Sequence, residues 1–117
     1  MIVNRKEAIS HIRNGWGLNG LDKKFFKDIE FILDVIKYDY SIIKEIDFRL
    51  LSNREFALKL LEVNGTFFNF LSDELKSDKN ICIKAIQKTN GKVMEYIPNY
   101  LRKDSDILHT YNEFRLI

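Results

Sequence analysis

The sequence is poor in the residues that mark several protein classes. Its 117 residues include one cysteine, one proline and five glycines. A single cysteine, Cys82, excludes an internal disulfide and suits a reducing compartment, so we predict a cytoplasmic protein. So few prolines and glycines argue against a disordered chain and against a turn-rich β-sandwich.

Long uncharged apolar runs are also missing. No such run approaches the roughly 20 residues that are needed to span a bilayer, so we expect no membrane partner. Residues 1–13 mix Arg5, Lys6, Glu7 and His11 with apolar residues and lack the apolar core of a signal peptide. Hydrophobic residues nevertheless make up 45% of the chain, which is enough for the core of one soluble domain.

Patterns that indicate catalysis or metal binding are missing too. His11 and His109 stand near opposite ends of the chain and Cys82 is alone, so no cluster of metal ligands is predicted. No Gly-x-Ser-x-Gly or Cys/His signature of a nucleophile occurs. The glycine-rich stretch 14–20 has neither a preceding strand nor a following Lys-Ser/Thr, and we interpret it as an irregular turn. We predict a protein that is not an enzyme and has no metal or other cofactor.

The sequence does contain an internal repeat of about 25 residues, the length expected of a stacked structural unit. Its copies are residues 28–52, 53–77 and 78–103, with a partial copy at 104–117 and a degenerate copy at 4–27. The clearest shared positions are the opening residues Asp28, Asn53, Asp78 and Asp104 and the Asn-Gly pairs that end in Gly65 and Gly91. The third copy has one extra residue before its Asn-Gly pair.

Each shared position has a physical reason. Asp and Asn are preferred helix N-caps, so helices should start close to the four opening residues. The glycines should end these helices in the left-handed conformation, and a shorter second helix and then a loop should follow. The apolar spacing gives one buried helix face. The predicted core consists of Phe31, Leu33, Ile36, Phe56, Leu58, Leu61, Leu71, Ile81, Ile83, Ile86 and Ile97.

A unit of this size cannot bury its apolar face alone, so neighbouring units must stack. We predict an all-α fold in which tandem helical hairpins form a short α-solenoid-like array, a single helical-repeat domain over residues 1–117. The alternative is one irregular helical bundle whose copies do not superpose. Cys82 occupies the position of Ile32 and Ala57 in the other copies, and we predict that it is a core residue.

The repeat resembles a known family. The order Asp-x-x-apolar, Asn-Gly, a short aromatic-Leu-Ser segment and Leu-Lys-x-Asp is similar to the uncharacterised bacterial repeat family called domain of unknown function 4116. The similarity is closest over 53–104, with Phe70-Leu71-Ser72 and Leu75-Lys76-Ser77-Asp78 as its best stretches. Tyr40 and Pro98 depart from the pattern. The family has no assigned activity, so the resemblance implies the fold and adds almost nothing on function.

Aromatic residues that break the repeat pattern are the candidates for a binding site. A residue that is apolar in every copy indicates the core, whereas an aromatic in one copy indicates a local task. This comparison selects Trp16, Tyr40, Phe48 and Tyr100, of residue types that anchor protein interfaces. We predict a non-enzymatic module that binds another protein, either an adaptor or a stand-alone stoichiometric inhibitor of a larger effector. Small inhibitors carried by phages or mobile elements, such as anti-CRISPR proteins, follow that design.

The charge distribution provides the alternative function. Residues 1–27 carry six basic and two acidic groups, residues 28–52 carry three and six, and residues 78–103 carry six and two. Such alternation suits a protein partner with the opposite alternation better than it suits nucleic acid, which favours a continuous basic stripe. Lys84 and Lys88 lie four residues apart on one predicted helix face, and we predict that they contribute to binding the partner protein. The Lys-rich third copy is therefore either a nucleic-acid site or an ordinary solvated surface.

Overall fold

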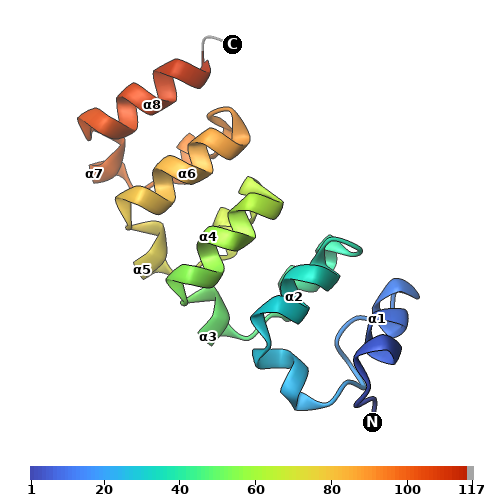
Figure 1. Ribbon diagram of the computed structural model, residues 1–117. Coiled ribbons are helices and arrows are strands. Elements are labelled where there is room, and N and C mark those ends of the chain that lie inside the picture. Colours follow the sequence, from blue (N-terminus) through green and yellow to red (C-terminus); the bar gives the residue numbers. More distant parts are fainter. Residues whose placement is uncertain (116–117) are drawn as a thin grey trace. The chain divides into compact units, whose positions relative to one another are not determined.

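The computed structural model describes residues 1–115, and this part of the chain is all-α (Figure 1). Strand-like pairing within it is confined to an isolated bridge between Ile2 and Leu21. The all-α prediction is therefore confirmed. The chain divides into two compact units, Met1–Leu50 and Leu51–Ile117. That all copies form one domain stays a prediction.

The first unit contains two long helices and shorter connecting ones. α1 (Arg5–Arg13) packs against α2 (Ile29–Ile36), and the 3₁₀ helix η1 (Lys23–Lys27) also contacts α2. A second 3₁₀ helix, η2 (Tyr40–Glu45), follows α2, and α3 (Phe48–Leu51) begins at the end of the unit. The core of the unit includes Ala8, Ile12, Leu18, Leu21, Phe25, Phe31, Ile32, Val35, Ile36, Ile42 and Ile43.

The second unit repeats one order of elements. Its helices are α4 (Arg54–Val63), η3 (Gly65–Phe70), α5 (Asp73–Lys76), α6 (Lys79–Thr89), η4 (Lys92–Tyr96), α7 (Asn99–Arg102) and α8 (Ser105–Arg115). α6 packs against both α4 and α8, and η3 packs against η4. The long helices of this unit therefore form one row and its 3₁₀ helices a second layer (Figure 1).

The helix starts lie where the sequence predicts them. Asp28, Asn53 and Asp78 are the N-caps of α2, α4 and α6, and Asp104 precedes α8. In each case a side-chain oxygen accepts a hydrogen bond from the backbone N–H three residues later, at 2.9–3.2 Å. These bonds satisfy donors that a helix leaves free in its first turn.

The same caps also link neighbouring copies. Arg54, the first residue of α4, donates from Nε to Oδ2 of Asp78 at 2.8 Å, and Lys79, the first of α6, lies 3.1 Å from Oδ2 of Asp104. Arg5, which opens α1, lies 4.0 Å from Asp28. A charged residue at the start of one long helix thus pairs with the cap of the next. Lys79 holds the pKa of Asp104 below its ordinary value.

The segment before each cap differs from the predicted loop. It folds into a one-turn helix in each of three copies, as α3, α5 and α7. In α5 the Oγ of Ser72 accepts from the Leu75 N–H and caps the turn. A copy therefore contains three helices rather than a hairpin. Four residues are too few for an apolar period to reveal a helix.

The prediction for the two Asn-Gly glycines is half right. Gly91 has a φ of +88° and follows Asn90, which is also left-handed at +53°, so this pair reverses the chain after α6. Gly65 has no positive φ and opens η3 instead. A Cβ at Gly65 would lie 2.7 Å from Cβ of Lys88 and 2.7 Å from Cγ2 of Thr89. Glycine is required there because η3 approaches α6 closely.

Most of the predicted core is buried, and the exceptions are two residues at the repeat position of Leu33, which is itself buried. Leu58 and Ile83 are half-buried, while Leu60 and Ala85, two residues further on, are fully buried. The buried face of α4 and α6 is therefore centred nearer to Leu60 and Ala85 than the sequence predicted. Cys82 is fully buried and its Sγ contacts the carbonyl oxygen of Lys76 at 3.1 Å, which confirms the core assignment. Burial raises the pKa of the Cys82 thiol to about 11.

Candidate partner-binding surfaces

The four aromatic residues selected from the sequence all reach solvent. The exposed fraction is 63% for Trp16, 50% for Tyr40, 69% for Phe48 and 64% for Tyr100. Trp16, Tyr40 and Phe48 belong to the first unit and Tyr100 to the second. Each therefore presents part of its side chain to solvent, on its own unit.

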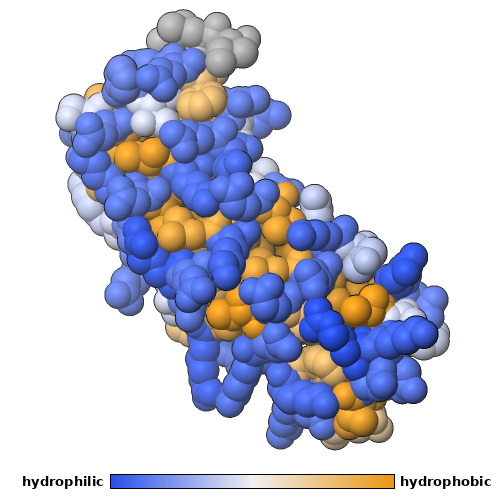
Figure 2. Space-filling view, in the orientation of Figure 1, coloured by the Kyte–Doolittle hydropathy of each residue, from blue (hydrophilic) through white to orange (hydrophobic). Residues whose placement is uncertain are grey.

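Exposed aromatic side chains are concentrated on the short elements. In the second unit Phe70 and Tyr96 end η3 and η4, and Tyr100 lies on α7. In the first unit the exposed aromatics after α2 are Tyr38, Tyr40 and Phe48. The long helices α2, α4 and α6 expose none. The face viewed in Figure 2 is largely hydrophilic, with scattered apolar patches.

Phe70 and Tyr96 were not among the sequence-based candidates. They share a repeat position, which made them resemble core residues. The signal that could have identified them is Glu45 at the same position in the preceding copy, because a charged residue there indicates contact with solvent. Glu45 is indeed exposed.

Arg102 holds together the two short helices that carry Tyr96 and Tyr100. Its Nε donates to the carbonyl oxygen of Ile97 at 2.8 Å, and its Nη2 donates to the carbonyl oxygen of Glu95. These bonds tie α7, which carries Tyr100, to the end of η4, which carries Tyr96. A hydrogen bond with the Glu95 side chain raises the pKa of Tyr96. Contacts within η4 and α7 therefore hold Tyr96 and Tyr100 in a fixed local arrangement.

The two candidate lysines share one carboxylate. Nζ of Lys84 and Nζ of Lys88 each lie 2.7 Å from an oxygen of Glu62 on α4. Hydrogen bonds from Lys84 and Lys88 lower the pKa of Glu62 to about 2. Lys79 is likewise engaged by Asp106 and Asp104. Much of the basic charge of the third copy is therefore compensated within the second unit.

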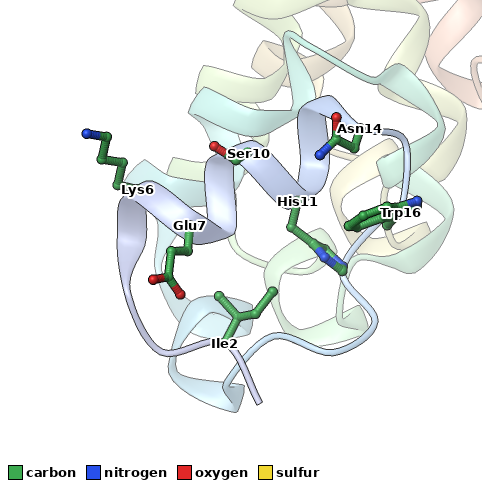
Figure 3. Close-up of a pocket in the computed structure, with 7 residues that line it drawn as sticks. All are labelled: Ile2, Lys6, Glu7, Ser10, His11, Asn14 and Trp16. Carbon is green, nitrogen blue, oxygen red and sulfur yellow. The ribbon is translucent and has the colours of Figure 1, made fainter.

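Trp16 borders an open hollow of about 290 Å³ in the first unit (Figure 3). The hollow runs along α1, and its lining residues are Ile2, Lys6, Glu7, Ser10, His11, Asn14 and Trp16. The His11 ring stands edge-on to the indole of Trp16, with ring centres 5.2 Å apart. Sequence patterns indicated Trp16 but not the groups that surround it.

The loop that carries Trp16 is held in place by several contacts. Gly15, Gly17 and Gly20 have positive φ angles of 84°, 65° and 89°, which side chains would disfavour. Glu45 accepts from the Leu18 N–H at 3.1 Å, and its carboxylate lies so close to Gly17 that a Cβ there would clash. The irregular turn predicted for residues 14–20 is thus an ordered loop.

One polar group of the hollow is engaged by the chain itself. His11 Nε2 lies 2.6 Å from the carbonyl oxygen of Asn19 and is engaged there. Across residues 1–115 no three His, Cys, Asp or Glu residues are grouped in a way that could hold a metal ion. No helix in this part of the chain has the length and apolar character that crossing a membrane requires.

A comparison with protein families agrees with the repeat. The family model described as Domain of unknown function (DUF4116) matches the chain twice, over residues 28–76 and 53–102. The chain belongs to this family. The two matches start 25 residues apart, in agreement with the repeat of about 25 residues. No curated protein and no solved structure matches the chain.

Proposed function

We propose that this DUF4116 protein is a non-enzymatic module that binds another protein. The observation that carries the proposal is the placement of exposed aromatics on the short helices of each unit, while α2, α4 and α6 expose none. Single exposed apolar residues are ordinary on protein surfaces. Tyr and Phe gathered on one class of element are usual anchors of protein interfaces. Trp16 adds an exposed indole on the loop of residues 14–20.

Nucleic-acid binding through the third copy is the second candidate, and the Lys-rich composition of residues 78–103 favours it. Lys84 and Lys88 both pair with Glu62 at 2.7 Å, which weighs against it. A lysine must give up such a pair before it can neutralise a phosphate. Binding of this kind would weaken steeply as salt is added.

We further propose that the copies stack as a short α-solenoid-like array and that the protein acts in the cytoplasm. Two observations support the array, namely the repeated order of elements and the row of long helices in the second unit. Whether the protein is an adaptor or a stoichiometric inhibitor is decided by its partner. An inhibitor would abolish the activity of its effector when one chain is bound per effector.

Capture of a partner tests the proposed function. The wild-type protein and the Tyr40→Ala/Phe48→Ala/Tyr100→Ala variant are used as baits in lysate of the native cell, and captured proteins are identified by mass spectrometry. We expect the wild type to capture a protein that the variant loses, because exposed aromatic anchors often contribute about 2 kcal/mol or more each. Helical content and melting temperature should stay nearly unchanged, since all three side chains are exposed.

A matched control variant is Asn80→Ala/Gln87→Ala, which removes two exposed side chains from the long helix α6. It should capture the partner as well as the wild type. Capture that survives loss of the three aromatics contradicts the proposal. Salt-sensitive retention of RNA or DNA that disappears with Lys84→Glu/Lys88→Glu would support the second candidate instead.

A further inference from the structure

Neighbouring long helices within a unit meet in one register. The first residue of a long helix lies beside the N-cap of the next, as Nε of Arg54 lies 2.8 Å from Oδ2 of Asp78 in the second unit. The same kind of contact brings Arg5 within 4.0 Å of Asp28 in the first unit. Both units therefore set the starts of neighbouring long helices side by side, and this fixes one end of the register.

A second contact fixes the register further along these helices. Counted from the N-cap, the ninth residue of α4 is Glu62, and its carboxylate lies 2.7 Å from Nζ of both Lys84 and Lys88. These lysines are the sixth and tenth residues after the cap of α6. In the first unit the ninth residue is Arg13, whose Cζ lies 5.2 Å from the ring centre of Tyr38, the tenth residue after the cap of α2. The ninth position of one long helix thus faces the sixth and tenth positions of the next.

The corresponding face of α1 offers hydrogen-bond donors. The sixth and tenth positions after its cap Asn4 hold Ser10 and Asn14, and both side chains are exposed. Together with Arg13 they line a hollow of about 380 Å³. A hydroxyl, an amide and a guanidinium can all donate hydrogen bonds, and the guanidinium adds positive charge. This face of α1 therefore suits a carboxylate.

α8 carries a carboxylate at the matching position. Glu113 is the ninth residue after Asp104, which bonds the first turn of α8. Its side chain is 58% exposed and lies 2.9 Å from His109 on the same helix. Leu108, the fourth residue after Asp104, is 40% exposed. The equivalent residues of the other long helices are all fully buried, as Ala8, Ile32, Ala57 and Cys82. α8 therefore exposes groups that a further helix would cover.

α1 departs from the other copies on its donor-bearing face. The third and seventh residues after the cap are fully buried in α2, α4 and α6, as Phe31, Val35, Phe56, Leu60, Ile81 and Ala85. In α1 these positions hold Glu7 and His11. Glu7 lies between Asn4 and Ser10 on one side of the helix, because residues three or four apart are neighbours there. A carboxylate thus stands where the other copies place a core residue.

The faces of α8 and α1 are complementary in the register of the repeat. Ser105, His109 and Glu113 follow one another at intervals of four residues, so they share one side of α8. Three pairs would meet if α8 of one chain lay against α1 of another. They are Ser105 with the cap Asn4, His109 with Glu7, and Glu113 with Ser10 and Asn14. Each pair joins a donor to an acceptor, and exposure to solvent alone does not account for such a match.

We propose that the chain binds a second copy of itself head to tail, with α8 of one chain packed against α1 of the next. The contact continues the packing that joins neighbouring long helices within each unit, and it covers Leu108. It is heterologous, because two different faces meet, so each added chain presents another α8 face. The inference goes beyond the proposed function, since the partner is the same chain and Tyr40, Phe48 and Tyr100 take no part.

Sedimentation velocity of the 117-residue chain, at concentrations from about 10 µM to about 1 mM, measures this self-association. We expect the weight-average sedimentation coefficient to rise across that range, with a Kd of about 0.1 mM for each contact, because one pair of helices buries little surface. The species should grow past two copies, since a head-to-tail contact leaves one α8 face open.

Charge variants test the register. Ser10→Glu sets a carboxylate against Glu113 and should weaken association at least about tenfold, because like charges meet. Gln87→Glu adds the same charge at an exposed position of α6, and this matched control should associate as the wild type does. Mixing Ser10→Glu with Glu113→Lys in equal amounts should restore association, because the introduced lysine meets the introduced carboxylate. Circular dichroism verifies that each variant is folded.

A chain that stays monomeric at about 1 mM overturns the proposal, as does association that stops at two copies, which indicates a symmetric dimer. Unchanged association of Ser10→Glu, or no recovery in the mixture, overturns it as well. The Tyr40→Ala/Phe48→Ala/Tyr100→Ala variant should self-associate as the wild type does. If that variant loses its captured partner but the wild type is monomeric, the protein-binding function stands and this inference fails. If self-association behaves as expected but no protein is captured from lysate, the proposed function fails instead.

Discussion

Gly65→Ala should destabilise the second unit through crowding alone. The added Cβ would lie 2.7 Å from Cβ of Lys88 and 2.7 Å from Cγ2 of Thr89, where carbon atoms normally stay about 3.5–4.0 Å apart. Neither neighbour can turn away easily. Cβ of Lys88 is fixed to the backbone, and the Thr89 hydroxyl donates to the Ala85 carbonyl at 2.8 Å. η3 and α6 must therefore move apart, at a cost of about 1–3 kcal/mol.

The free energy of unfolding in urea, followed by circular dichroism, measures this cost. Thr89→Ser provides the matched background, because it removes Cγ2 and keeps the hydroxyl that bonds Ala85. Gly65→Ala should cost clearly less in that background than in the wild type. A loss below about 0.5 kcal/mol in the wild type would refute the close approach of η3 to α6 as the reason for glycine. Equal losses in both backgrounds would refute the part assigned to Thr89 and leave Cβ of Lys88, at 2.7 Å, as the contact that requires glycine.

Three further outcomes follow from burial and charge. Leu61→Ala should lower the free energy of unfolding by about 2–5 kcal/mol in urea titrations, because Leu61 is fully buried in α4. Hydrogen bonds from Lys84 and Lys88 lower the pKa of Glu62 from 4.5 to about 2, so its stabilising effect should be complete above pH 4.5 and lost as the pH falls toward 2. Urea titrations of Glu62→Gln should lack that part of the pH dependence. Iodoacetamide should modify the buried Cys82 slowly at pH 8 in native protein and fast in urea, as mass spectrometry can follow.

The helix starts were predictable because capping is local chemistry. Asp28, Asn53 and Asp78 each bond a backbone N–H three residues away, so the cap and its target lie in one short segment. The place of Gly65 was not predictable in the same way. Its reason is the approach of Lys88 and Thr89 from α6, a tertiary contact that an Asn-Gly dipeptide does not encode.

The candidate site was predictable in part for a related reason. Trp16 and Tyr100 differ from their equivalents in other copies, and both are exposed. Glu7 and His11 also differ, but a charged or polar residue on a helix surface attracts no notice until the equivalent residues are known to be buried. The ordered loop that brings Trp16 to His11 depends on Glu45, which lies 27 residues beyond Leu18.

The choice between Asp and Asn at the helix caps follows from the preceding copy. Both residues cap a helix about equally well, so capping does not explain the choice. Asp78 and Asp104 are caps whose carboxylates pair with Arg54 and Lys79, the first residues of the preceding long helices.

The remaining copies obey the same rule. Asp28 follows a helix that opens with Arg5, whereas Asn53 follows one that opens with the apolar Ile29. The cap residue is therefore charged where the preceding long helix opens with a charged residue, and neutral where that helix opens with an apolar one. This is expected where the start of one helix lies beside the cap of the next. Copies within a single chain thus carry pairwise information of this kind. The same comparison also separates residues that serve packing from those, such as Glu7 and Trp16, that packing does not explain.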